Sequence, residues 1–302
     1  MKNMLSVKIK KLLVLIIAVF LIGSIQSQTD PVKEDLGRLN RPTTSQRAEV
    51  SQKIGISFIK VNYGRPNVKN RKIFGGLLQY GKIWRLGADY QTILDLQNEY
   101  IIQTDTIPKG KYALYAIPNK DKWTIIFNTD TNGWGQYTYK EENNVFKFEV
   151  ERQDSPEFTE TFTIGFMNTS MNNGELFIQW EDSRVRLPIT IGKKHREEIE
   201  KNFTTALGLN ERRVGYKYYL VSEYLFIEEK DYKKALAYIQ KSIDTGNTAF
   251  YTHYLKGEIL FAMGNKSAAV AAAREAQKNL FKGFSNPEWE HKIEKAIVDW
   301  GK

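Results

Sequence analysis

The sequence predicts a two-domain β + α protein, with an antiparallel β-sandwich of the jelly-roll type followed by an α-helical repeat domain. Between residues 53 and 192, short segments that alternate apolar and polar residues recur between Gly, Pro, Asn and Asp turns. This pattern is typical of all-β sandwiches and barrels. After Gly192 the apolar spacing becomes helical and continues to the end of the chain. A length of 302 residues is sufficient for two domains.

Residues 1–27 have the features of a secretory signal peptide. Four lysines and no acidic residue accompany an unbroken apolar run over residues 12–22, and Gly23 and Ser24 follow it. The run is short for a bilayer span of about 20 residues, although an uncleaved anchor is the alternative interpretation. We therefore expect an exported protein, periplasmic or extracellular, without a membrane span after cleavage. Polar residues 28–52 are interpreted as an exposed lead-in to the sandwich.

Composition excludes several classes of site. The chain has no cysteine, which rules out disulfides and thiolate metal ligands. The formal charge is +9, but four lysines belong to the leader, so the remainder carries 40 basic against 35 acidic residues. No long basic block accompanies this small excess, and we expect no nucleic-acid partner.

The strands of the sandwich are predicted from the alternation. In residues 54–63 the alternation shifts phase, which would be explained by a β-bulge. The further predicted strands are residues 92–96, 112–117, 123–128, 145–150, 158–166, 175–180 and 184–191. Two layers built from these strands would bury the inward-facing Phe, Ile and Tyr side chains against each other.

The helical part, residues 193–302, repeats weakly with an offset of 34 residues. Ala235 then falls on Ala269 and Ser242 on Ala276. A 34-residue period of paired helices resembles the tetratricopeptide repeat, of which we expect about two copies and a closing helix near residues 287–300. Glu223 stands where the first repeat usually has Gly, which departs from the pattern. The resemblance implies a protein partner bound by the repeats.

Ordered motifs in the first domain resemble domain-of-unknown-function family 2911 (DUF2911). They include Tyr63-Gly64-Arg65-Pro66, Tyr80-Gly81-Lys82-Ile83-Trp84-Arg85-Leu86-Gly87-Ala88, Trp123-Thr124-Ile125-Ile126-Phe127-Asn128 and Trp134-Gly135-Gln136-Tyr137. The resemblance covers roughly residues 41–191 and implies an exported β domain with no established activity. Leu86, Asp89 and Tyr90 replace the family's usual Thr, Asn and Glu, which changes the polar groups at that segment.

The histidines argue against common catalytic sites in the sandwich. His195, His253 and His291 all follow the β domain, so neither a Ser-His-Asp triad nor a His-rich metal site is available there. We expect each histidine on a helix surface. Nucleotide-binding and Gly-x-Ser-x-Gly signatures are also absent from the sequence. No catalytic residue, cofactor or metal is predicted.

An arginine-rich stretch between residues 63 and 92 carries the candidate ligand site. Guanidinium groups bind carboxylates, phosphates and sulfates through paired donors and stack on aromatic rings. With nearby aromatic side chains they could line a cleft for an anionic or sugar-like ligand. The candidate ligand-binding residues are Arg65, Arg71, Tyr80, Trp84, Arg85, Asp89 and Trp134.

Two structural alternatives accompany this hypothesis. The arginines could instead pair with Asp89, Asp95 or Glu99 and tie loops to the sandwich. Trp134 could be an exposed stacking platform on its turn-rich loop or a buried plug at one end of the sandwich. The neighbouring glycines, among them Gly75, are interpreted as turn residues with positive φ.

The function predicted from these features is non-enzymatic binding or assembly in the cell envelope. A hydrolase acting on a glycan is the alternative, with Asp89 or a neighbouring carboxylate as the catalytic group. That chemistry needs two carboxylates about 5 to 10 Å apart.

Overall fold

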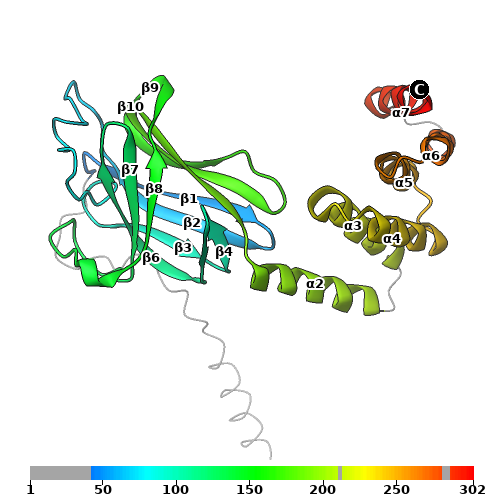
Figure 1. Cartoon of the computed structure of the whole chain (residues 1–302), viewed down its shortest axis with the longest axis horizontal. Helices are drawn as coiled ribbons and strands as arrows, with labels where there is room; N and C mark the ends of the chain where they lie inside the picture. Colours follow the sequence, from blue (N-terminus) through cyan, green and yellow to red (C-terminus); the bar gives the residue numbers. More distant parts are fainter. Residues whose placement is uncertain (1–41, 210–212, 281–285) are drawn as a thin grey trace, which may run out of the picture. The chain divides into compact units, whose positions relative to one another are not determined.

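The computed structural model describes residues 42–209, 213–280 and 286–302. The predicted signal peptide and residues 28–41 of the predicted lead-in lie outside the described residues. Strands occupy the first part of the described chain, and helices follow from residue 193 (Figure 1). This order confirms the predicted β + α arrangement.

Two antiparallel sheets form the first part. The larger sheet has the order β1 (Gln46–Ile54), β2 (Ser57–Arg65), β3 (Thr92–Leu96), β6 (Gly110–Pro118), β7 (Lys122–Asn128) and β8 (Asn144–Glu151). The smaller sheet has the order β5 (Asp105–Ile107), β4 (Tyr100–Ile102), β10 (Asn173–Ile191) and β9 (Gln153–Met167). Most sheet neighbours are successive in the chain. The exception is the β4–β5 hairpin, which lies between β3 and β6 in the sequence but belongs to the smaller sheet.

The two sheets share one apolar core, which is densely aromatic at the end that carries the long loop between β2 and β3. Trp84 from this loop stacks on Trp180 of β10, with ring centroids 5.8 Å apart and an interplanar angle of 21°. Phe162 and Trp123 contact Trp84 edge-on at 5.1 and 6.0 Å. A loop residue in the core fixes the position of its chain neighbours.

The first strand begins earlier than predicted. Residues 46–52, assigned to the lead-in, belong to β1, which pairs with β2 in continuous register. The inward-facing positions of β1 are Ala48, Val50, Gln52 and Ile54, of which only Ile54 is fully buried, so the alternation in its sequence is weak. The bulge expected within residues 54–63 is not found. The β1–β2 register is continuous, and these residues span a hairpin turn in which Ile54 pairs with Ser57 and Gly55 has a φ of 65°.

The last strand is longer than predicted. The segments expected at residues 175–180 and 184–191 form the single strand β10, interrupted by register shifts around Glu181. Glu181 has a φ of 56°, and its carboxylate accepts hydrogen bonds from the backbone N–H groups of Ile73 and Phe74 at 3.3 and 3.4 Å. The irregularity therefore helps to hold the β2–β3 loop against the sandwich.

Six α-helices follow among the described residues: α2 (Lys193–Gly208), α3 (Val214–Tyr224), α4 (Tyr232–Asp244), α5 (Phe250–Ala262), α6 (Lys266–Lys278) and α7 (Pro287–Gly301). A short π-helical segment, Leu225–Glu229, continues α3. Helices α4 and α6 begin 34 residues apart. Their caps, Asp231 and Asn265, accept hydrogen bonds from the backbone N–H of Lys234 and Ala268. No helix in the described part of the chain has the length and apolar character needed to cross a bilayer.

His195 on α2 is not the surface residue that we expected. Its side chain is fully buried, and its Nε2 accepts a hydrogen bond of 3.1 Å from the backbone N–H of Ile56. Its ring packs edge-on against Tyr100 at 5.1 Å. The first turn of α2 lies against the β1–β2 hairpin, which explains the burial. His291 is exposed as predicted, and His253 is half-buried.

Candidate functional site

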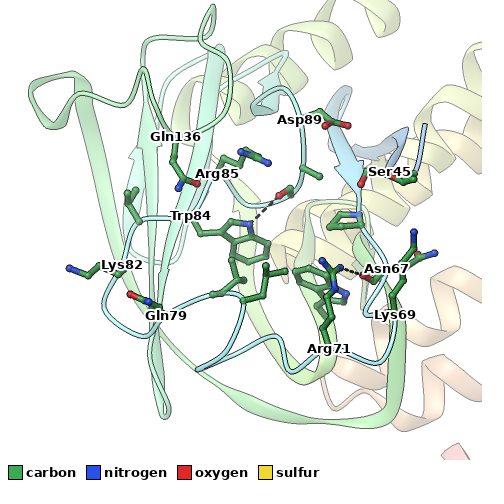
Figure 2. A pocket seen from close by; sticks show the side chains of 18 of the residues that line it. Ser45, Asn67, Lys69, Arg71, Gln79, Lys82, Trp84, Arg85, Asp89 and Gln136 are labelled. Atoms are coloured by element: carbon green, nitrogen blue, oxygen red, sulfur yellow. Dashed lines mark hydrogen bonds between the residues drawn. The ribbon is translucent and has the colours of Figure 1, made fainter. Parts of the chain in front are cut away.

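A cleft of roughly 740 Å³ lies where the β2–β3 loop meets the loop between β7 and β8. Figure 2 shows Trp84 between Arg85 and Gln136 on one side and Arg71 and Asn67 on the other. Polar and charged residues dominate the lining. They are Thr44, Ser45, Asn67, Lys69, Arg71, Gln79, Lys82, Arg85, Asp89 and Gln136, with Leu77, Leu78, Ile83, Trp84, Tyr137 and Trp180 among the apolar and aromatic ones.

Trp84 anchors the cleft wall to the core. Its backbone exchanges two hydrogen bonds with Ala116 of β6, at 2.7 and 2.8 Å. The indole is buried, and its Nε1 donates a bond of 3.1 Å to the carbonyl of Gly87. Because successive side chains of an extended segment point to opposite sides, burial of Trp84 turns Arg85 toward the cleft.

Arg85 is the most unusual group of the cleft. Its Nε is buried and has no hydrogen-bond partner among the described residues. The backbone of the β7–β8 loop lies over the guanidinium, since a Cβ at Gly135 would be 2.9 Å from Nη1. Gly135 has a φ of 67°, so two constraints favour glycine there. The cation is thus partly removed from water without a fixed partner.

Arg71 and Arg65 are held by neutral oxygens. Arg71 donates from Nε to the carbonyl of Val68 at 2.9 Å and from Nη2 to that of Asn67 at 2.6 Å. It still lines the cleft. Arg65 donates to the carbonyl of Phe162 and the hydroxyl of Thr163, at 3.2 and 3.0 Å, and is not a lining residue.

The predicted pairing of these arginines with carboxylates is not found in the described part of the chain. Asp95 faces Lys111 across neighbouring strands at 3.9 Å, and Glu99 faces Lys194 at 3.7 Å. Arg65, the last residue of β2, instead links the two sheets through acceptors on β9, and Arg71 bonds only to carbonyls of its own loop. Among the described residues, Arg85 makes neither kind of contact.

Asp89 lines the cleft and lies above Trp84 in Figure 2, as Arg85 does. It has a φ of 60° and is half-buried. Burial lowers the pKa of Arg47, and the charge of Asp89 partly offsets this effect. Among the described lining residues, Asp89 is the only carboxylate.

The aromatic candidates separate into two groups. Trp84 lines the cleft, whereas Tyr80 lies outside the lining and packs against Gly75. Trp134 is also outside, is 50% exposed, and stacks on Tyr137 with centroids 6.0 Å apart. Tyr137 is 78% exposed and lines the cleft. Of the two alternatives for Trp134, the structure favours the exposed platform.

The structure adds residues that the sequence analysis did not select. Lys69 and Lys82 lie in the same basic stretch and add two cations to the lining, although Lys82 points away from the centre of the cleft (Figure 2). Their position between the arginines of that stretch could have indicated that they line the same site. Gln136 and Tyr137 stand within a quoted motif, whereas nothing in the sequence singles out Thr44 or Ser45.

Gln91 positions the β7–β8 loop from beneath. Its side chain is buried and its Nε2 donates to the hydroxyl of Tyr115 at 2.6 Å and to the carbonyl of Asp130 at 3.1 Å. Its Oε1 accepts from the backbone N–H of Gly133 at 2.9 Å. These bonds place the segment that covers Arg85.

The arrangement suits an anion more than a metal ion. Four cations, Lys69, Arg71, Lys82 and Arg85, line the cleft with one carboxylate. No group of three or more His, Cys, Asp or Glu side chains that could hold a metal ion occurs in the described ranges. Planar guanidinium donors in such a cleft can bind carboxylate, sulfate or phosphate oxygens.

Comparison with known proteins finds a family match for the sandwich. Residues 45–189 match the family described as protein of unknown function, DUF2911. The DUF2911 match contains all residues of the two sheets except Thr190 and Ile191, and nearly all of the cleft, and it confirms the resemblance seen in the motifs. It does not extend to the helices, so the tetratricopeptide-like character has no support from a family match. No curated protein matches the chain.

Proposed function

We propose that the protein is an exported, non-enzymatic binding and assembly module of the cell envelope, whose DUF2911 sandwich binds a small anionic or sugar-like ligand in the cleft. The observation that carries the proposal is Arg85, a partly desolvated guanidinium with a buried, unbonded Nε. Leaving such a donor unpaired is costly, and an oxyanion would supply its missing acceptors.

Charge and size support this assignment. The four lining cations exceed the single lining carboxylate, which favours a ligand with net negative charge. A volume of roughly 740 Å³ is within the range of about 300–1,000 Å³ that is typical of small-molecule sites. Tyr137 offers an exposed ring face, and Asp89 offers acceptors for hydroxyl groups of a sugar-like ligand.

The alternative is a glycan hydrolase that uses Asp89. Two-carboxylate hydrolysis requires a second acid about 5 to 10 Å from the first. The described lining offers no second acid, and the carboxylates of Asp95 and Glu99 lie next to lysines. The geometry therefore favours binding over hydrolysis.

The assembly part of the proposal concerns the helices. We infer that α3–α6 form two tetratricopeptide-like repeats closed by α7, and that they bind a protein partner. Helices α4 and α6 share a 34-residue spacing and the same capping interaction. Stacked helix pairs expose continuous surfaces suited to protein recognition. The leader features of residues 1–27 support export to the periplasm or the exterior.

Calorimetric titration of residues 28–302 tests the cleft. We expect sulfate, phosphate or glucuronate to bind and neutral glucose to bind more weakly. Arg85→Gln should weaken anion binding about tenfold or more, as expected for loss of a charge-assisted bond. Arg274→Gln, which removes an exposed arginine from α6, is the matched control. Equal anion binding by Arg85→Gln and the wild type, or no binding of any anion, would show the proposal to be wrong.

The same protein distinguishes the hydrolase. Release of nitrophenol from a panel of aryl glycosides, abolished in Asp89→Asn, would replace the binding proposal with the enzymatic one. We expect no turnover by either protein.

A further inference from the structure

Cations line the cleft from both sheets of the sandwich. Arg85 follows Trp84, whose backbone is bridged to Ala116 of β6 in the larger sheet. Lys69 and Arg71 lie in a turn of the β2–β3 loop that is bonded to β9 of the smaller sheet. Figure 2 shows Arg85 and Arg71 on opposite sides of Trp84. We name Lys69 and Arg71 the turn cations.

Hydrogen bonds to β9 set the position of the turn. The N–H of Val68 donates to the carbonyl of Glu160 at 2.8 Å, and the N–H of Lys69 donates to the carboxylate of the same residue at 2.9 Å. Asn67 forms an isolated β-bridge with Thr161, whose hydroxyl also donates to the Oδ1 of Asn67 at 2.7 Å. The turn cations are therefore placed by the smaller sheet, independently of the contacts that place Arg85.

Both groups of cations keep donors for a ligand. Arg71 uses Nε and Nη2 for carbonyls of its own loop, and no bond from its Nη1 is found in the described part of the chain. Among the described residues, the Lys69 ammonium forms neither a hydrogen bond nor an ion pair. Arg85 adds its buried, unbonded Nε. An anion bound at either place would meet donors that the protein does not use itself.

The lining between the two groups of cations is apolar. Trp84 and Trp180 both line the cleft and stack at 5.8 Å, and Leu77 and Leu78 lie in the same lining. These side chains offer no charge and suit a hydrocarbon spacer. A compact anion at Arg85 would leave the turn cations without a counter-charge. A ligand that satisfies both groups carries two anionic groups joined by a spacer.

We propose that the cleft binds a small dianionic ligand of the dicarboxylate class, with one carboxylate at Arg85 and the other at the turn cations. This inference rests on the proposed function, which it deepens by naming the class of ligand. The cleft volume of roughly 740 Å³ accommodates such a molecule. The second contact adds affinity only where the spacer matches the separation of the two groups of cations, so the affinity should depend on spacer length.

Calorimetric titration of residues 28–302 with linear dicarboxylates from malonate to azelate, at constant ionic strength, tests the inference. We expect the affinity to pass through a maximum at one chain length. The best dicarboxylate should bind at least about tenfold more tightly than its monoamide, which has the same length and a single charge.

The outcomes separate this inference from the proposed function. Equal affinities for the dicarboxylate and its monoamide, or no dependence on chain length, would overturn the inference and leave anion binding at Arg85 intact. A protein that binds sulfate but no dicarboxylate would overturn it as well. No binding of any anion would show the proposed function itself to be wrong, and the inference with it.

Variants of the turn locate the second carboxylate. Lys69→Gln should weaken the best dicarboxylate roughly threefold to tenfold and leave its monoamide within about twofold, because the single carboxylate of the monoamide binds at Arg85. Lys72→Gln removes the same charge from an exposed residue of the same loop that does not line the cleft, and it should leave both affinities within about twofold.

Arg71→Gln should weaken the dicarboxylate at least as much as Lys69→Gln does. Since Arg71 also bonds to two carbonyls of its loop, circular dichroism and urea denaturation are needed to confirm that this variant is folded. Equal weakening of the dicarboxylate and its monoamide by Lys69→Gln would mean that all the cations form a single site. Equal effects of Lys69→Gln and Lys72→Gln would show a response to net charge alone. Either result would overturn the inference.

Discussion

Arg85 shows how one side chain can be unfavourable for the fold and useful to a site. Its neighbour Trp84 is buried among aromatic rings, whereas Arg85 brings an unbonded, buried Nε to the cleft. Groups that lack hydrogen-bond partners in the ligand-free protein are expected where a ligand will supply them. Stability and binding should therefore respond in opposite directions at this residue.

We predict that Arg85→Met makes the ligand-free protein more stable while it weakens anion binding. Methionine fills similar space without the desolvated charge, so the free energy of unfolding should rise by about 0.5 to 1 kcal/mol. Urea denaturation without added anions measures this change. A loss of more than about 1 kcal/mol would mean that Arg85 makes a structural contribution.

His195 gives the protein a pH-dependent element of stability. Burial lowers the pKa of His195 below its ordinary value, an effect that the charge of Glu198 and the Glu99 carbonyl partly oppose. Its Nε2 accepts the Ile56 N–H, so the folded protein holds the neutral ring. The unfolded chain binds the proton more readily, and stability is lost as the pH falls through the unfolded pKa of about 6.5.

We expect the thermal midpoint to decrease from pH 7.5 to pH 5.5, and to do so less in His195→Gln. Glutamine retains an acceptor for the Ile56 N–H but does not titrate. The difference between the two proteins isolates His195 from the carboxylates, which titrate at lower pH. Parallel midpoint curves for wild type and variant would contradict this assignment.

At the scale of elements, the β7–β8 loop depends on the core beneath it. Gln91 holds Asp130 and Gly133 by their backbones, and this fixes the segment whose Gly135 covers Arg85. We predict that Gln91→Leu destabilises the fold by about 2 kcal/mol, because the hydroxyl of Tyr115 and the N–H of Gly133 lose their partner.

Hydrogen exchange in residues 130–137 measures the effect of Gln91→Leu on the loop. Exchange should become faster there and stay unchanged in β2, and anion affinity should fall because Arg85 loses its cover. Ser222→Ala, which removes a buried side-chain hydrogen bond to the carbonyl of Ala235 in the helical part, is a suitable comparison. Unchanged exchange in the loop would show that other contacts hold it.

The elements also show what the sequence can and cannot predict. Strands that bury one face, such as β3 and β8, were found because their alternation records the core. β1 was missed because its inward-facing Ala48, Val50 and Gln52 are small or polar and only partly buried, so its alternation is weak. The arginine stretch could be located, but Arg65 could not be excluded from the cleft. The direction of the Arg65 side chain is set by its hydrogen bonds to β9, almost 100 residues away in the sequence.

The whole molecule joins strands and helices more closely than the change of pattern at Gly192 suggests. Ile199 of α2 and Tyr224 of α3 belong to the same buried apolar cluster as the sandwich core. Asn172, just before β10, donates a hydrogen bond of 2.8 Å to the hydroxyl of Tyr224. Arg196 of α2 pairs with Glu229, which also accepts from Tyr224. The sequence boundary between strands and helices is therefore not the boundary of the apolar core.

We predict that a chain of residues 28–208 is more stable than one of residues 28–192. The shorter chain loses α2 and exposes the apolar surface that Ile199, His195 and Phe203 cover, which should cost about 2 to 4 kcal/mol. Urea denaturation of both chains beside residues 28–302 measures the difference. Because both shorter chains lack Tyr224, the difference in stability between residues 28–208 and residues 28–192 reports the contribution of α2 alone. Equal midpoints would mean that α2 is only a connector. If α2 stabilises the sandwich, tests of cleft binding by the isolated sandwich must use a chain that includes α2. Loss of binding by residues 28–192 would otherwise reflect a weakened core and not an absent partner surface.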